Sequence, residues 1–258
     1  MNVMKNKIRI VSTSWDDGHP CDLRLAEALS KRSLAATFYV PLANQEGRIV
    51  LEGADLRELL RAGFEIGAHT VSHCVLCGLS NRNLFDEVMD SKRFLEDELG
   101  REVRMFCYPC GRYNQKVIDC VAKAGFLGAR TTHMFSRHLE FNPYRMPTSL
   151  QAFPHPPFNY LKNLSRQRDL GGVFHYFKDY VRCKNWVELG KTLFLEVMEH
   201  GGIWHLYGHS WEIDELGLWD KLDELFDFVS NRPDVIYVPN SAVLDLTRGI
   251  FPAAVGVA

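Results

Sequence analysis

The chain has 258 residues, of which 46% are hydrophobic and 24% charged, and its formal net charge at pH 7 is −2. This balance excludes the basic surface typical of nucleic-acid-binding proteins, and no run of about 18 apolar residues could span a bilayer. Residues 1–7 are polar and basic and lack the apolar segment of a signal peptide, so we expect a cytoplasmic protein. The length suits one domain over residues 1–258, with a frayed tail at residues 250–258.

Seven cysteines are scattered through the apparent core elements, and we expect them to be reduced thiols. Two Cys-x-x-Cys pairs, at residues 74–77 and 107–110, raise the alternative of a four-thiolate zinc site. The gap between the pairs holds a whole predicted helix and exceeds the usual spacing of about 15–20 residues, which disfavours that site.

Short apolar strands alternate with amphipathic helices along the chain. Strands are expected at residues 8–11, 35–40, 64–68, 103–108, 126–130, 203–207 and 235–238, with a short one near 144–146. Helices are expected at residues 22–32, 54–61, 80–99, 114–123, 159–167, 186–200, 218–229 and 241–247. Repeated βα units predict an α/β fold of parallel strands with helices outside, closed into a barrel.

Two adjacent carboxylates, Asp16 and Asp17, follow the first strand, and Gly18 allows the backbone to turn directly after them. The chemistry of (β/α) barrels lies at the C-terminal ends of the strands, where this pair falls. Two such carboxylates can divide the roles of metal ligand and proton acceptor. Because Asp-Asp-Gly is also a common turn, the pair acquires meaning only from other residues on the same rim.

Two histidines, His69 and His73, stand at the end of the third expected strand. Their imidazoles would share one face if the chain made a helical turn there, and two histidines at this spacing can bind one metal with Asp17 as an anionic third ligand. Three protein ligands leave coordination positions open for water and substrate, as in catalytic sites. An isolated pair of this kind is also explained by two surface histidines, but the neighbouring carboxylates favour a metal site.

Three segments, Ser14–Gly18, His69–His73 and Phe106–Asn114, resemble in this order the first three motifs of the polysaccharide deacetylases. These proteins are also called NodB-homology or carbohydrate esterase family 4 enzymes. The resemblance implies a distorted (β/α)7–8 barrel with one divalent metal ion, which hydrolyses an N-acetyl group on a sugar. Zinc is the first expectation for the metal, with cobalt, nickel and iron as alternatives.

Carried over position by position, the resemblance implies that Asp17, His69 and His73 bind the metal and that Asp16 is the catalytic base. The turn of the third motif implies a backbone N–H that stabilises the developing oxyanion, which we assign to Cys110.

The resemblance also implies that the general acid is a histidine just after a late apolar strand, where this chain offers His205 and His209. We favour His209 because it falls at the C-terminal end of the strand, where the rim lies. His205 lies deeper and is well explained as a hydrogen-bonded core histidine.

The third motif departs from the family pattern, because Cys107 and Cys110 occupy positions that usually carry an arginine and an aromatic residue. That arginine normally orients the catalytic base. We expect Arg130, at the end of the fifth strand, to orient Asp16 in its place, with Arg112 as the second candidate.

The sequence therefore predicts a metal-dependent hydrolase that removes an acetyl or other acyl group from an acetylated sugar, in surface-glycan or polysaccharide metabolism. One alternative is a hydrolase of a non-sugar amide or cyclic ureide on the same fold. Another is an inactive glycan-binding protein, which has no need for a base beside a metal. The expected partner is an acetylated carbohydrate, without nucleic acid or an integral membrane segment; the oligomeric state stays open.

Overall fold

The structure is a computed structural model that describes residues 7–166, 172–173 and 176–250. Most of the tail that the sequence predicts to fray, residues 251–258, lies outside the described residues, so this prediction is untested. Within the described part of the chain, no helix has the length and apolar character needed to cross a membrane.

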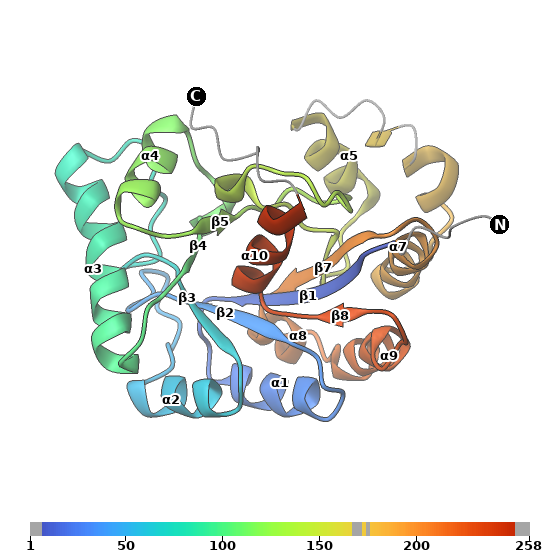
Figure 1. The fold of residues 1–258 in the computed structure, drawn as a ribbon, viewed down its shortest axis with the longest axis horizontal. Coiled ribbons are helices and arrows are strands. Elements are labelled where there is room, and N and C mark those ends of the chain that lie inside the picture. Colours follow the sequence, from blue (N-terminus) through green and yellow to red (C-terminus); the bar gives the residue numbers. More distant parts are fainter. Residues whose placement is uncertain (1–6, 167–171, 174–175, 251–258) are drawn as a thin grey trace.

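Strands and helices alternate along the chain as predicted (Figure 1). The strands are β1 (Arg9–Asp16), β2 (Ala36–Val40), β3 (Glu65–Ala68), β4 (Met105–Cys107), β5 (Gly128–Arg130), β6 (Leu150–Gln151), β7 (Gly202–Gly208) and β8 (Ile236–Tyr237). The α-helices are α1 (Cys21–Ser30), α2 (Gly53–Arg61), α3 (Asn81–Leu99), α4 (Gln115–Lys123), α5 (Pro157–Arg166), α7 (Trp186–His200), α8 (Ser210–Glu215), α9 (Trp219–Val229) and α10 (Asn240–Ile250). Short helical segments are η1 (Pro109–Gly111), η2 (Pro143–Arg145) and η3 (Tyr176–Tyr180).

All described strands belong to one parallel sheet in the order β5-β4-β3-β2-β1-β7-β6, with β8 beside β1. The segment before β6 connects the two ends of this order. Met146 forms a parallel bridge with Arg130 of β5, and Leu150 pairs with Leu206 of β7. The sheet therefore curls into a distorted (β/α) barrel, which confirms the predicted fold class.

The central strand β1 directs alternate side chains to the two faces of the sheet. Val11 and Trp15 belong to the large hydrophobic core between sheet and helices, where Trp15 packs edge-on against Phe226 of α9. Ile10 belongs to a separate cluster inside the barrel. The same alternation points Asp16, the last residue of β1, into the barrel at its C-terminal end.

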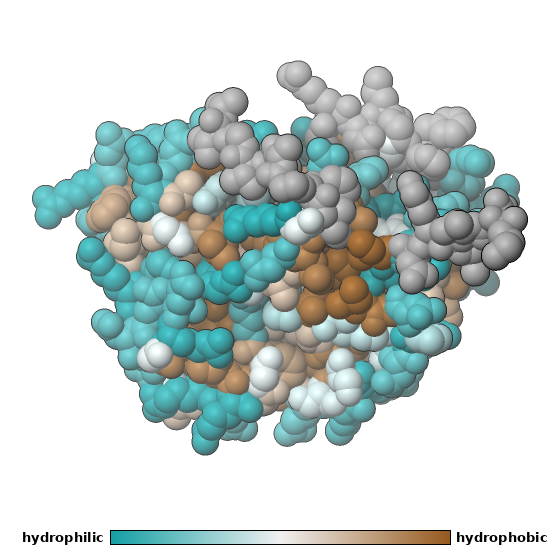
Figure 2. All heavy atoms as spheres, viewed as in Figure 1, coloured by the Kyte–Doolittle hydropathy of each residue, from teal (hydrophilic) through white to brown (hydrophobic). Residues whose placement is uncertain are grey.

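Helix α10 closes the opposite end of the barrel. Its Val243 and Leu244 are buried in the interior cluster, and Asn240 accepts a hydrogen bond from Ser12 and donates one to Tyr39. Figure 2 shows this face, with hydrophobic residues gathered in its middle beside α10 and hydrophilic residues over the outer helices. Because this end is filled, the C-terminal ends of the strands are left to form a site.

Helix α3 is capped at both ends. The Ser80 side chain accepts a hydrogen bond from the Asn83 N–H at 3.2 Å, and Gly100 ends α3 in the left-handed conformation at φ 64°. All seven cysteines are free thiols, outside any disulfide.

Two local predictions are wrong. The segment expected to be a strand near residues 144–146 is the end of the short helix η2, and only Met146, directly after it, makes a bridge. The short elements β6 and α8 were not predicted, because two or six residues are too few to display a hydrophobic period.

Candidate active site

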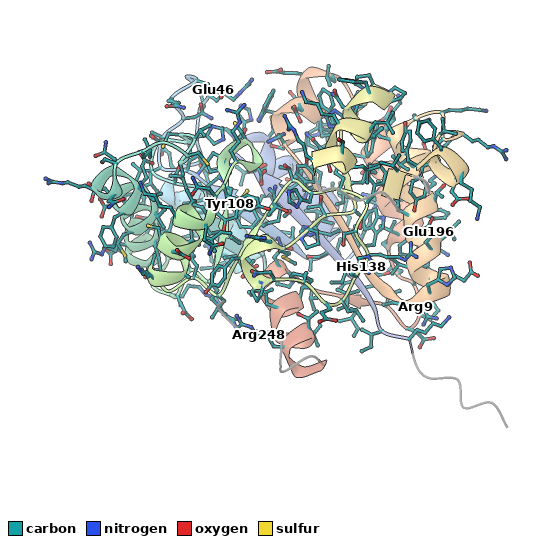
Figure 3. All side chains as sticks on the ribbon, turned by 90° about the horizontal axis from the view of Figure 1, so that it is seen from above. Arg9, Glu46, Tyr108, His138, Glu196 and Arg248 are labelled. Atoms are coloured by element: carbon teal, nitrogen blue, oxygen red, sulfur yellow. The ribbon has the colours of Figure 1, made fainter. Side chains whose placement is uncertain are left out.

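A cavity of about 420 Å³ opens at the C-terminal ends of the strands. Among the residues that line it are most of those singled out from the sequence, namely Asp16, Asp17, His69, His73, Cys110 and His209. In Figure 3, Glu46 of the cavity wall lies at the opposite end of the molecule from Arg248 of α10. The structure therefore brings residues from β1, β3, β4 and β7 to one rim.

Asp17, His69 and His73 form a compact buried cluster on this rim. Asp17 Oδ1 lies 3.1 Å from His73 Nε2 and 3.7 Å from His69 Nε2, and a set of ligand atoms from the three residues lies within 4.8 Å of one another. Asp17 Oδ1 is buried and has no hydrogen-bond partner. An orphaned carboxylate oxygen facing two imidazole nitrogens fits a divalent metal with open positions.

The surroundings of the cluster orient its side chains. His69 Nδ1 donates to the Cys107 carbonyl at 2.8 Å, which leaves Nε2 directed at Asp17. Burial lowers the pKa of His69 to about 4, so the imidazole is in the neutral form that binds metals. Trp211 Nε1 donates to Asp17 Oδ2 at 2.9 Å. Burial alone would raise the pKa of Asp17, but the neighbouring His73 and the other histidines hold it well below its usual range.

Left-handed backbone is concentrated at this rim. Asp17, Thr70, His73 and Cys110 have φ values of 76°, 71°, 56° and 55°, a conformation that non-glycine residues rarely adopt and that is often retained at functional sites. The helical turn expected from His69 to His73 does not form. The left-handed residues bring the two imidazoles to Asp17 instead.

Asp16 forms an ion pair with Arg130, the arginine that the sequence analysis favoured over Arg112. Arg130 Nη2 donates to Asp16 Oδ1 in a fully buried ion pair, whereas Arg112 is exposed. Burial raises the pKa of Asp16, but the charge of Arg130, together with those of His69 and His209 and the Arg130 hydrogen bond, keeps the pKa below its usual range. The guanidinium carbon lies 4.8 Å from the ring centre of Tyr207 and 5.3 Å from that of Tyr39, so cation–π contacts offset part of its desolvation.

The register of the sheet explains how Arg130 takes this place. Cys107 of β4 and Arg130 of β5 are direct partners in the parallel pair. Arg130 lies at the same level of the sheet as position 107, one strand away. It can therefore reach Asp16, as an arginine at position 107 would. The Cys107 Sγ lies 3.8 Å from Asp16 Oδ2, and burial raises the pKa of this thiol, so it stays protonated and donates to the carboxylate.

Asp16, His69 and Cys107 form a second set of groups with metal-ligand spacing. This set is the poorer site, since Asp16 already binds Arg130 and the buried thiol keeps its proton. A thiolate, not a thiol, is the metal ligand.

His209 follows β7 directly and faces the carboxylates. Its Nε2 lies 3.9 Å from Asp16 Oδ2, and its Nδ1 lies 2.7 Å from Glu212 Oε2. Burial favours the neutral ring, but the hydrogen bond to Glu212 and the charges of Asp17, Glu212 and Asp16 raise the pKa of His209 to about 9. At neutral pH the ring therefore carries a proton that it can donate.

His205 lies inside the barrel. Its Nε2 is 2.9 Å from Ser14 Oγ, and its Nδ1 donates to the Pro147 carbonyl at 3.1 Å. Burial lowers its pKa to about 3. It is a neutral, hydrogen-bonded core histidine and does not line the cavity described above.

A polar network that contacts His209 through Glu212 was not predicted from the sequence. Gln151 Nε2 donates to Glu212 at 3.3 Å, while Gln151 Oε1 accepts from Tyr207 at 2.9 Å and lies 2.8 Å from His155 Nε2. His155 continues to Asn159 of α5 at 3.3 Å. The spacing of His209 and Glu212, three apart on the first turn of a helix, would have revealed the pair had α8 been predicted.

In sequence, the chain is similar to known proteins of one family. Residues 4–129, just under half of the chain, match the family model described as polysaccharide deacetylase. The chain is 26% identical over 125 residues to the putative polysaccharide deacetylase YxkH of Bacillus subtilis, which covers 48% of this chain and 45% of the relative. It is 26% identical over 123 residues to the peptidoglycan-N-acetylglucosamine deacetylase of Bacillus cereus, with 47% and 55% covered. The chain thus spans about half the length of the curated relatives it matches.

The fold is similar over a longer stretch. A crystal structure of a putative polysaccharide deacetylase from Mycobacterium smegmatis superposes with a TM-score of 0.68 at 19% identity, covering 97% of this chain and 94% of that one. These findings confirm the resemblance and the barrel that it implied.

Proposed function

From the confirmed similarity to the polysaccharide deacetylases, we propose that this chain is a metal-dependent hydrolase that removes an N-acetyl or other acyl group from an acetylated sugar. The observation that carries the proposal is the convergence, in one cavity, of the buried Asp17-His69-His73 cluster with a base held by arginine, Asp16, and a protonated His209. A role in surface-glycan or polysaccharide metabolism follows from the substrate class, and a cytoplasmic location stays a prediction.

The residues have complementary tasks in amide hydrolysis. A divalent metal held by Asp17, His69 and His73 would polarise the carbonyl and acidify a water; we propose zinc, with cobalt, nickel and iron as alternatives. Asp16 takes the proton of the water as its oxygen adds to the carbonyl carbon.

The second half of the reaction needs an oxyanion donor and an acid. The backbone N–H of Cys110, which lines the cavity, stabilises the oxyanion. His209 gives its proton to the amide nitrogen as the C–N bond breaks, which releases acetate and the free amine. An inactive glycan-binding protein would leave the buried Arg130–Asp16 pair and the protonated His209 unexplained.

Acetate release tests the proposal directly. Purified protein loaded with zinc is incubated with N-acetylglucosamine oligosaccharides and phosphosugars, and in parallel with cyclic ureides. We expect acetate from the sugars, loss of activity with a chelator and recovery with added metal. Turnover of ureides alone, or of nothing, would contradict the proposed function.

The Glu212→Gln variant should shift the alkaline limb of the pH–rate profile. Glu212 raises the pKa of His209, whose protonated form is needed; the wild-type rate therefore falls as the pH rises through about 9. Without the carboxylate the pKa drops, so the limb should move down by about one unit or more. The matched control is Glu215→Gln on the same helix. An unmoved limb would mean that His209 is not the acid.

The Trp211→Phe variant should weaken metal binding. Trp211 donates a hydrogen bond to Asp17 Oδ2, and partners that orient a ligand contribute about ten-fold or more to metal affinity. Competition with a chelating dye measures the affinity. Trp219→Phe, which removes a bond to Asp214 outside the cluster, should leave it unchanged.

A further inference from the structure

Helix α5 presents one polar face to the cavity. Asn159, Lys162, Asn163 and Arg166 all line it, and their spacing of three, four and seven residues places them on one side of a helix. This wall is formed by the first helix after β6, and none of its residues belongs to the expected catalytic set.

The face is fixed against the rim. Asn163 Oδ1 accepts from the Met134 N–H at 2.9 Å, and its Nδ2 donates to the Thr132 carbonyl at 2.8 Å. One turn earlier, Asn159 contacts His155 of the polar network that contacts His209. These contacts determine which side of α5 faces the cavity, and Lys162 and Arg166 lie on that side.

Neither cation has a charged partner in the part of the chain that the structure describes. Across the described residues, no ion pair or side-chain hydrogen bond involves Lys162 or Arg166, although both line the cavity. Asp16 is paired with Arg130, and Asp17 faces the histidines. Glu46, the remaining lining carboxylate, lies apart from α5 in Figure 3.

Their spacing suits one phosphate or diphosphate group. The two residues are four apart, which separates them by about 6 Å along the helix axis. At this separation both side chains can reach oxygens of the same phosphate or of two adjacent phosphates. Lysine supplies a point charge and arginine a planar pair of donors, the two usual binders of phosphate in proteins.

We propose that the substrate carries a phosphoryl group joined to the acylated sugar, and that Lys162 and Arg166 bind this group while the amide lies at the metal cluster. This inference rests on the proposed function. A neutral polysaccharide would leave both cations unpaired. A sugar phosphate and a nucleotide diphosphate sugar share the required chemistry.

The test compares three substrates with the zinc-loaded enzyme: N-acetylglucosamine 1-phosphate, UDP-N-acetylglucosamine and neutral diacetylchitobiose. We expect a KM at least about ten-fold lower for one of the phosphorylated sugars, and a rise of about ten-fold in that KM in Lys162→Gln/Arg166→Gln with kcat nearly unchanged. The KM for diacetylchitobiose should not change. The phosphorylated sugar with the lower KM shows whether the substrate is a sugar phosphate or a nucleotide diphosphate sugar.

The matched control is Lys123→Gln/Lys221→Gln, which removes the same charge from exposed positions on α4 and α9. Salt should raise the KM of the phosphorylated sugar in the wild type and much less in the cavity variant. An equal KM for neutral and phosphorylated sugars, or an equal effect of both double variants, would overturn the inference.

The failure of the proposed function would look different. If no acetylated sugar releases acetate, calorimetric titration with N-acetylglucosamine 1-phosphate still decides the inference. Binding that is weakened only in Lys162→Gln/Arg166→Gln would support it, and binding that is absent or the same in all variants would overturn it.

Discussion

Replacing Asp17 by asparagine should remove the bound divalent metal and lower the turnover of an acetylated sugar by about a thousand-fold or more. Asp17 would be the anionic ligand beside two histidines, and its Oδ1 is buried with no hydrogen-bond partner. Asparagine keeps the shape and can still accept the Trp211 hydrogen bond. The loss would therefore be one of charge and metal affinity, with little change in the fold.

Metal analysis of protein purified without chelators measures this effect, and a thermal melt checks the fold. Glu46→Gln is the matched control, because Glu46 lines the same cavity but lies outside the Asp17-His69-His73 cluster. We expect the control to retain its metal. An unchanged metal content in Asp17→Asn would show that the ligand set is wrong, whatever happens to activity.

The meeting of Asp17, His69 and His73 was predictable because it follows from the topology of the sheet. Asp17 and His69 come directly after β1 and β3, and parallel strands bring their C-terminal ends to one edge. Alternation along β1 then separates Asp16, which points into the barrel, from Asp17, which begins the turn. Sequence spacing was enough to predict the meeting, without any knowledge of the side-chain conformations.

The details of the turns were not predictable in the same way. The spacing of His69 and His73 is the same in a helical turn and in a left-handed bend, so the pattern cannot distinguish the two conformations. Glu212 lies on the six-residue helix α8, too short for a hydrophobic period. The cationic face of α5 meets the cavity through contacts with residues about 30 positions earlier in the chain, which local patterns do not encode.

The position of the arginine illustrates what sheet register adds to a motif. The sequence showed that position 107 lacks its usual arginine and that Arg130 ends a later strand. Only the pairing of Cys107 with Arg130 shows that the two positions are equivalent with respect to Asp16. A motif can thus lose a residue in one strand and regain its charge from the neighbouring strand.

The Arg130→Gln variant should lower kcat/KM at neutral pH by about a hundred-fold and destabilise the protein by about 3–5 kcal/mol. Asp16 would be left buried without its cation, and its pKa would rise. Because the base acts when deprotonated, the acidic limb of the pH–rate profile should move to higher pH, and part of the activity should return there. Arg112→Gln, which changes the exposed second candidate, is the matched control.

A swapped variant separates orientation of the base from a general loss of stability. Cys107→Arg combined with Arg130→Cys exchanges the two register partners and returns the charge to the other strand. If the charge on Asp16 is what matters, the swap should recover about ten-fold or more of the lost kcat/KM and move the acidic limb back to lower pH. If Arg130→Gln keeps the wild-type pH profile while both variants melt early, Arg130 supports the barrel and does not tune the base.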